Sequence, residues 1–322
     1  MTRFILNRLA VLFLTFLGIT FITFLVINIS PGKPQDAYDF SAKISYESKQ
    51  RLVKLYQLDK PLHQRYFHWL KRLLVLDFGY SFKDDKPVIK KIGERLPATL
   101  LLNLLSMSII FVLGCITGIL MCYYHNKLFD KIANFFVFLG YSVPKYWLAI
   151  LCMLLFGIKL GWLPISGLRS VNYDYLNWYE KIFDLLKHLI LPVVIASIGG
   201  IAGLSQYVRG NMLEQLQSEY IKFAKSKGTK SSRIIFYHMF RNVLIPVVTI
   251  LGLSLPELIG GGFVFETIFS YPGMGRLGYE AIMARDYPLI MGIATITAVM
   301  TLVGNFIADI VYAYVDPRVR YK

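Results

Sequence analysis

Charge is scarce in this sequence of 322 residues. Only 17% of its side chains are Asp, Glu, Lys or Arg, whereas 55% are hydrophobic. Soluble globular domains carry about 25% charged residues, which cover their surface. The shortage of charge, together with long hydrophobic blocks, excludes an ordinary soluble domain and indicates a membrane protein.

Cysteine is also rare, and the motifs of several enzyme classes are missing. The three cysteines, Cys115, Cys122 and Cys152, lie in hydrophobic blocks without metal spacing. We expect them to be small buried side chains rather than a disulfide framework. The five histidines lack ligand spacing, and neither G-x-S-x-G nor H-E-x-x-H occurs. We therefore predict no catalytic residue, metal site or cofactor in this chain, and a membrane enzyme is the least favoured class.

A phosphate loop of the form G-x-x-x-x-G-K-[ST] is missing as well. If the chain moves a solute, the energy must come from another subunit or from an ion gradient. A stand-alone secondary transporter would use the gradient, but the sequence shows no inverted repeat, which many such folds contain.

The hydrophobic blocks are long enough to cross a membrane as helices. Crossing the hydrocarbon core takes about 20 apolar residues in a helix, and only helices or closed barrels satisfy their backbone there. The blocks are much longer than the roughly 9–11 residues of a barrel strand, and they do not alternate. We predict an all-α integral membrane protein whose six transmembrane helices lie at about 9–29, 99–124, 132–158, 189–208, 243–268 and 289–315.

The distribution of Lys and Arg predicts that both termini are cytoplasmic. With the N-terminus inside, the inner segments 1–8, 125–131, 209–242 and 316–322 carry 14 basic residues in 56 positions. The short outer loops, 159–188 and 269–288, carry 6 in 50, and positive charge favours the inside. The outer loop 30–98 also carries 14 Lys and Arg, but its 69 residues exceed the roughly 60-residue limit within which loop charge controls topology. This bias accounts for the net charge of +15 without a nucleic-acid partner. The first block lacks a small-x-small cleavage site, so we expect an uncleaved helix.

The outer loop between the first two spans contains a helical region. From Glu47 to Leu76 the pattern predicts two short amphipathic helices that are separated near Pro61. The second places Leu62, Tyr66, Trp69 and Leu73 on one side. Such a region is either a cap that packs on the membrane domain or a docking surface for an external partner.

The cytoplasmic loop 209–242 predicts a stiff hairpin. We expect a helix from Glu214 to Lys227 that ends at Gly228 in a left-handed C-cap. Thr229 to Ser232 supply N-cap candidates for a second helix that runs to Asn242. The hairpin either receives force from a cytoplasmic motor or lies on anionic lipid headgroups, and the residues alone leave both open.

Short motifs follow one another along the chain from near residue 50 to the C-terminus. The cytoplasmic loop contains Glu219-Tyr220-Ile221, Ala224-Lys225-Ser226-Lys227-Gly228 and Arg241-Asn242-x-x-Ile245-Pro246. The others are Leu58-Asp59-Lys60-Pro61-Leu62, Asp77-Phe78-Gly79-x-Ser81, Glu94-Arg95-Leu96-Pro97-Ala98-Thr99-Leu100, Ser142-Val143-Pro144, Gly161-Trp162-Leu163-Pro164, Glu266-x-x-Phe269-x-Tyr271-Pro272-Gly273-Met274-Gly275 and Asp316-Pro317-Arg318-Val319-Arg320. The loop motifs resemble the EAA loop of ABC-importer permeases. The ordered set resembles the B-type permease subunits of bacterial dipeptide, oligopeptide or nickel importers, which are binding-protein-dependent transport inner-membrane components.

This resemblance implies a type I ABC-importer permease fold in the bacterial cytoplasmic membrane. It implies a first helix with its extracytoplasmic loop in residues 1–94, a transmembrane core in 95–315 and a cytoplasmic tail in 316–322. The implied partners are a second homologous permease subunit, an external substrate-binding protein and two cytoplasmic ATPases, which would hold ATP and Mg²⁺. Dipeptides or oligopeptides are the implied substrates, with a nickel chelate or another small solute as the alternative.

The resemblance also assigns roles within the cytoplasmic loop. The expected ATPase-coupling residues are Glu219, Tyr220, Ala224, Lys227, Gly228, Arg241, Asn242 and Pro246. The chain departs from the general EAA pattern at Lys222, where that pattern has Glu.

Two charges inside the predicted spans are candidates for the translocation pathway. Lys145 follows Pro144 in the third span, and Glu257 follows Pro256 in the fifth. A lone charge at the bilayer centre costs about 2.5–3.5 kcal/mol or more, so such residues are functional candidates. We hypothesise that Lys145 and Glu257, with Ser142, line the pathway and meet the termini of a zwitterionic peptide. The alternatives are an ion pair between the two charges, or a Lys145 side chain that reaches an interface.

Overall fold

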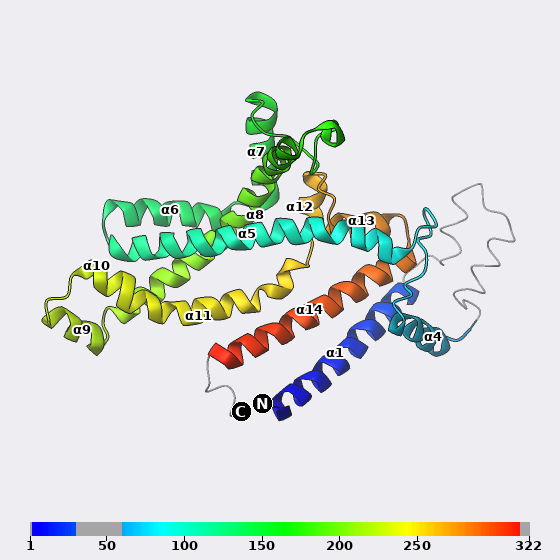
Figure 1. The fold of residues 1–322 in the computed structure, drawn as a ribbon, viewed down its shortest axis with the longest axis horizontal. Coiled ribbons are helices and arrows are strands. Elements are labelled where there is room, and N and C mark those ends of the chain that lie inside the picture. Colours follow the sequence, from blue (N-terminus) through cyan, green and yellow to red (C-terminus); the bar gives the residue numbers. More distant parts are fainter. Residues whose placement is uncertain (1, 30–59, 316–322) are drawn as a thin grey trace. The chain divides into compact units, whose positions relative to one another are not determined.

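The structure, a computed structural model, describes residues 2–29 and 60–315, and within these ranges the regular elements are helices (Figure 1). The predicted all-α fold is therefore confirmed there. Helices that are individually long and apolar enough to cross a membrane occur in α1 (Thr2–Ile29), α5 (Val88–Tyr123), α8 (Trp178–Gln215) and α14 (Tyr287–Val315). Two bent helix pairs bring the possible spans in the described residues to six.

The third predicted span is broken rather than continuous. Helix α6 (Leu128–Ser142) and the helix formed by α7 (Lys145–Cys152) and the π-helical η1 (Met153–Lys159) meet at 103°. Between them Val143 adopts an extended conformation. The cause is Pro144, because proline disfavours the helical conformation in the residue before it. The segment predicted as one span over 132–158 is therefore divided into two helices.

The fifth predicted span is also interrupted. Helix α11 (Phe240–Leu253) ends well before residue 268, and a 3-10 turn, η4 (Leu255–Leu258), follows it. The short helix α12 (Phe263–Ile268) begins only after the glycines 260–262. Pro256 has no backbone donor, and glycine loses much conformational freedom in a helix. Hydrophobicity continued across this segment, but the backbone preferences of these residues ended the helix.

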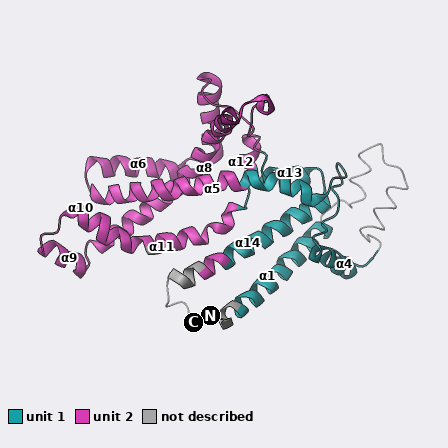
Figure 2. Cartoon of the chain, in the orientation of Figure 1, with its two compact units in different colours: residues 1–99, 259–263, 272–306 teal, residues 100–258, 264–271, 307–322 magenta. Residues whose placement is uncertain are grey.

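The chain divides into two compact units (Figure 2). The first contains the described parts of residues 1–99, 259–263 and 272–306, and the second those of 100–258, 264–271 and 307–322. Each unit combines segments that are distant in sequence. The predicted domain boundary between residues 94 and 95 stays a prediction.

In the first unit, α4 (Leu62–Leu74) packs against α1 and α14. Tyr66 of α4 is buried with Phe24 and Met291, and Trp69 packs against this cluster. The hydroxyl groups of Tyr66 and Thr20 are 3.1 Å apart. The second amphipathic helix predicted for the outer loop is thus confirmed, although Leu62 is exposed. The helix predicted before Pro61 lies outside the described residues.

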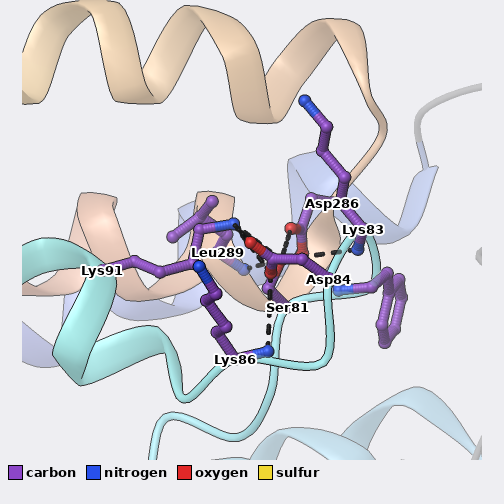
Figure 3. A network of polar contacts seen from close by, with 8 residues as sticks. Ser81, Lys83, Asp84, Lys86, Lys91, Asp286 and Leu289 are labelled. Carbon is purple, nitrogen blue, oxygen red and sulfur yellow. Dashed lines mark hydrogen bonds and ion pairs between the residues drawn. The ribbon is translucent and has the colours of Figure 1, made fainter.

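A buried carboxylate fastens the segment before α5 to the segment that leads into α14 (Figure 3). Asp286 is buried, accepts a hydrogen bond from the Ser81 hydroxyl, and accepts another from the Phe82 N–H at 3.0 Å. Lys91 Nζ donates to Ser81 Oγ at 2.9 Å and pairs with Asp84 at 3.0 Å. The two hydrogen bonds to Asp286 join residues that are 205 and 204 positions apart in sequence.

In the second unit, α5 and α8 approach closely at two glycines. A Cβ on Gly114 would lie 2.9 Å from Leu204 Cβ, and one on Gly118 would lie 2.6 Å from the Ser205 carbonyl oxygen and 2.7 Å from Val208 Cβ. Glycines four residues apart allow membrane helices to pack with their backbones close together. The G-x-x-x-G spacing of this pair is a signal of that packing in the sequence itself.

Replacing Gly118 with alanine is expected to destabilise the protein by about 1–3 kcal/mol, because overpacking forces a backbone shift. Thermal unfolding in detergent measures the effect. Gly93 is the matched control, since it lies in the same helix and a Cβ there meets nothing within 4 Å. Gly93→Ala should be neutral or slightly stabilising, because alanine favours helix over glycine. Equal melting temperatures for the two variants would contradict the close approach.

Candidate coupling surface and translocation cavity

The cytoplasmic hairpin begins with a turn that the sequence did not reveal. Helix α8 continues to Gln215, and α9 (Glu219–Ser226) starts after a break at residues 216–218. Ser218 is the N-cap residue of α9, and its hydroxyl donates to the Gln215 carbonyl at 2.6 Å. Serine side chains compete with helical backbone bonds in this way. The predicted continuous helix from Glu214 to Lys227 is therefore wrong.

The turn after α9 has the predicted left-handed glycine. Gly228 has φ +74°. Its N–H donates to the Lys225 carbonyl at 2.9 Å, and the Thr229 N–H donates to the Ala224 carbonyl at 3.2 Å. The conformation of Gly228 is thus confirmed, whereas its role in coupling stays a prediction.

The second half of the hairpin differs from the prediction. The N-cap residue is Lys230, whose side chain makes no capping bond. An ammonium group can only donate hydrogen bonds, so it cannot accept one from the N–H groups of the first helical turn. Helix α10 (Ser231–Arg233) continues through the π-helical η3 (Ile234–Met239) into α11, so the helix does not end at Asn242. Because the helix continues to Leu253, the hairpin is joined to the next span without a loop, and Pro246 lies at a 41° bend.

Helix α9 is anchored by a single buried side chain. Ile221 is fully buried in a cluster with side chains of α5, α8, η3 and α11. The cluster includes Met212, Ile234 and Met239, and Ala224 packs against it. Burial of an isoleucine contributes about 1.5–3 kcal/mol, so Ile221 holds the short helix in place.

Two of the predicted coupling residues meet in one hydrogen-bond chain. The Tyr220 hydroxyl donates to Gln215 Oε1 at 2.5 Å and accepts from Asn242 Nδ2 at 3.1 Å. Tyr220, Gln215 and Asn242 belong to α9, α8 and α11, so these hydrogen bonds connect the three helices of the hairpin. The sequence predicted Tyr220 and Asn242 separately, and the fold brings them together.

The solvent-facing side of the hairpin combines aromatic and basic residues. Phe223 is 62% exposed, and the Lys227 ammonium lies 4.4 Å from the centre of its ring. Phe236 and Tyr237 of η3 are also exposed. The other exposed charged residues between positions 219 and 242 are Glu219, Lys222, Lys225, Lys230, Arg233 and Arg241. We call this the coupling surface.

An ion-pair network that no sequence motif indicated braces the same end of the unit. Arg209 of α8 contacts both oxygens of Asp130, in the first turn of α6, at 2.9 Å each. Asp130 also accepts from the Asn126 N–H at 3.0 Å and from Asn134 Nδ2 at 2.8 Å. Burial raises the pKa of Asp130, but the hydrogen bonds from Arg209 and Asn126 outweigh it, and the net pKa is lowered. No local pattern pairs residues 79 positions apart.

A mostly apolar cavity of about 380 Å³ lies inside the second unit. Glu257 is the only carboxylate among its lining residues, which otherwise include Tyr141, Tyr207 and Ser254. The amide of Asn103 on α5 donates to the carbonyl oxygens of Glu257 and Leu258, at 3.2 and 2.9 Å, and holds this turn in place.

The predicted pathway residues separate in the structure. Glu257 lines the cavity, whereas Lys145 and Ser142 are exposed and are not among its lining residues. Lys145 begins α7, and its Cε would lie 3.3 Å from a Cβ on Gly199 of α8. The ion pairs found in the described residues do not include one between Lys145 and Glu257. The roles of all three residues stay predictions.

Broken spans, a cavity lined by α5, α8 and α11 and a helical hairpin between two spans are features of helical membrane transport proteins. The comparison with known families makes this specific. A family model described as the binding-protein-dependent transport system inner membrane component matches residues 110–321, and its N-terminal counterpart matches residues 1–103. The chain belongs to this family of ABC-importer permeases.

Its relatives align over the full length of the chain. The oligopeptide transport system permease protein AppB of Bacillus subtilis is 37% identical over 322 residues, 100% of both chains. The di/tripeptide transport system permease protein DppB of Pseudomonas aeruginosa is 32% identical over 335 residues, also 100% of both. The dipeptide transport system permease protein DppB of Escherichia coli is 33% identical over 338 residues, with the same coverage.

A solved structure supports the fold. The inward-facing MetNI methionine ABC transporter matches with a TM-score of 0.52 at 15% identity, and the match covers 71% of this chain and 97% of that chain. The predicted type I ABC-importer permease fold is thereby confirmed. At this identity the match concerns the fold alone.

Proposed function

We propose that this chain is a permease subunit that forms the membrane pathway for dipeptides or oligopeptides in an ATP-driven importer. The full-length similarity to oligopeptide, di/tripeptide and dipeptide permeases carries the proposal. None of these three relatives is named as a nickel permease, so the nickel alternative is not better supported. ATP hydrolysis is assigned to separate ATPase subunits, and the chain itself acts as a conduit.

The coupling surface is the proposed contact with the ATPases. Exposed aromatic side chains such as Phe223 and Tyr237 supply apolar area, and the surrounding lysines supply charge. Because Ile221 and the Tyr220 chain fix the hairpin to the core, a displacement of the hairpin would move α8 and α11 with it. ATP-driven closure of two ATPases would thus be transmitted to the spans of this subunit and of a second, homologous permease. This arrangement requires the proposed orientation, with both termini in the cytoplasm.

The cavity is the proposed passage for the peptide. Its apolar walls tolerate varied side chains, and the Glu257 carboxylate offers an acceptor for the ammonium terminus that every free peptide carries. An external substrate-binding protein would deliver the peptide and set most of the selectivity. Lys145 remains the proposed partner of the peptide carboxylate, from outside the cavity lining.

Purification of the tagged chain from its native membrane in mild detergent tests the proposed assembly. We expect a second six-helix permease and ATPase subunits to accompany it. If the chain emerges alone and moves solute in liposomes without ATP, it is a secondary transporter instead.

Replacing Glu257 with glutamine is expected to lower uptake of a neutral dipeptide about tenfold or more, because hydrogen bonds to charged groups contribute about 1.5–3 kcal/mol. Lys145→Ala should lower uptake in the same direction. Radiolabelled uptake into whole cells measures both. Glu214→Gln, an exposed carboxylate outside the cavity, is the control. Full uptake by both the Glu257 and Lys145 variants would end the hypothesis that these charges meet the substrate.

A further inference from the structure

A second pocket lies in the first unit, and it shares no lining residue with the translocation cavity. Its volume is about 60 Å³, and it is formed by α1, α4 and the start of α14. Its lining includes Phe24, Asn28, Arg65, Trp69, Tyr287 and Met291. A cavity needs about 10–15 Å³ to hold one water molecule, so the pocket has room for a small polar group.

The pocket contains a cation without a matching anion. Arg65 Nη2 donates to Asn28 Oδ1 at 2.6 Å, and the guanidinium lies 6.0 Å from the centre of the Phe24 ring. Its Nε is shielded from solvent and makes no hydrogen bond. Burial lowers the pKa of Arg65, and no carboxylate of the described residues pairs with it. A shielded guanidinium of this kind favours an anionic partner with oxygen acceptors.

The neighbouring Arg72 is satisfied and does not compete for such an anion. Its guanidinium pairs with Asp77, with distances of 2.8 and 3.1 Å to the two carboxylate oxygens. Arg65 is therefore the lining cation that gains most from an added anion.

Helix α4 has the composition of a helix that lies in the membrane interface. From Leu62 to Leu74 it contains three Arg or Lys residues and no Asp or Glu. Phe67 is exposed, as are the consecutive apolar residues 74–76 at its end. The apolar side chains Ile22, Val26 and Ile29 of α1 are exposed as well. Amphipathic helices with basic residues, aromatic rings and exposed apolar residues bind anionic lipid surfaces.

We propose that this pocket is a binding site for an anionic phospholipid, whose phosphate accepts from Arg65 while its acyl chains lie along the exposed side of α1. The basic charge of α4 selects a headgroup with net negative charge, such as that of phosphatidylglycerol. Trp69 and Tyr66 have the amphipathic rings that occur at this depth in membranes. The site does not depend on peptide transport, and only the choice of leaflet follows from the proposed orientation.

The test uses the full-length chain, with the subunits that accompany it, in lipid nanodiscs. A phosphatidylglycerol that carries a diazirine close to its headgroup is photo-crosslinked to the protein, and mass spectrometry identifies the labelled peptides. We expect label on α4 and on the end of α1 near Asn28. Unlabelled phosphatidylglycerol should compete about fivefold better than phosphatidylcholine, since one basic residue near an anionic surface contributes about 1 kcal/mol.

Three variants separate the pocket from general surface charge. Arg65→Gln should lower the labelling of these peptides about fivefold. Asn28→Asp should do the same while the arginine is kept, because it places a carboxylate against the guanidinium. Lys71→Gln removes one exposed charge of the same helix that does not line the pocket, and it should lower the labelling less than Arg65→Gln does.

Two outcomes would overturn the proposal. Thermal unfolding first establishes that the Arg65→Gln and Asn28→Asp variants are folded. If lipid labels either folded variant as strongly as the unmodified chain, the guanidinium does not hold the lipid. If inorganic phosphate displaces the label as well as phosphatidylglycerol does, the pocket binds a soluble anion and not a membrane lipid.

Discussion

Replacing Asp130 with alanine is expected to destabilise the protein by about 3 kcal/mol. Removing one partner of a buried ion pair typically costs about 3–5 kcal/mol, because the other charge stays desolvated. The Asp130 side chain is 3% exposed, but Arg209 is 20% exposed and water can partly solvate it. We therefore expect the lower end of this range. The measurement is the melting temperature in detergent, with helix content followed by circular dichroism.

The matched control is an ion pair of similar geometry at the surface. Lys222 and Glu219 are 2.7 Å apart, yet they are 61% and 88% exposed. Exposed pairs contribute about 0.2–1 kcal/mol, so Lys222→Ala should change the melting temperature little. If Lys222→Ala and Asp130→Ala destabilise the protein equally, burial does not determine the strength of the Arg209 network.

The pH dependence of stability gives a second readout for Asp130. Its pKa is lowered in the folded state, so the unfolded chain takes up this proton first as the pH falls. The stabilisation is fully present above the unfolded value of about 3.9 and is lost as the pH falls through the folded value. Asp130→Asn should therefore show a flatter decline in melting temperature between about pH 5 and pH 3 than the unmodified chain. A parallel decline would contradict the lowered pKa.

Replacing Gly228 with valine is expected to release the ATPase subunits and to lower ATP-dependent uptake about tenfold or more. A left-handed conformation costs an L-residue about 1–2 kcal/mol, and branching at Cβ adds to this strain. A Cβ on Gly228 meets nothing within 4 Å, so strain in the turn, and not a clash, is the cause. A free-energy change of about 1.4 kcal/mol corresponds to a factor of ten in affinity. If the strain shifts the turn and weakens ATPase binding by about this much, uptake falls about tenfold.

Two further variants test the conformational argument. Gly228→Asn should retain most of the coupling, because asparagine tolerates the left-handed region. Gly210→Val, at an open helical position of α8 at the edge of the same loop, should leave ATPase retention unchanged. Co-purification of the ATPases and peptide uptake are measured for all three. If Gly228→Val keeps the ATPases bound and the uptake intact, the turn is not part of the coupling contact.

The limits of prediction are visible in the broken spans. Hydrophobicity identified residues 132–158 and 243–268 as membrane segments, because it reports which residues avoid water. It does not report the path of the backbone. A proline can bend a helix slightly or end it, and the surrounding packing decides which of these occurs at Pro144 and Pro256. The 103° turn at Val143-Pro144 therefore became evident only in the structure.

Local chemistry was enough to predict several features by itself. The scarcity of charge and the long apolar blocks determined the class of protein, and the ordered motifs determined the family. The left-handed conformation of Gly228 also followed from the sequence, because glycine is the residue that adopts it without steric cost. The amphipathic pattern of α4 likewise predicted its helix and placed Tyr66 on the same side as Trp69 and Leu73. All of these depend on neighbouring residues or on composition.

Tertiary structure alone decided which distant residues meet. The pairs Asp130 with Arg209, Tyr220 with Asn242, and Ser81 with Asp286 join different elements of the chain. Tertiary structure also decided that Glu257 lines the cavity and that Lys145 does not. Such contacts arise because buried polar groups must find partners once the helices have packed. The choice among possible partners depends on helix positions and bends that no local pattern in the sequence specifies.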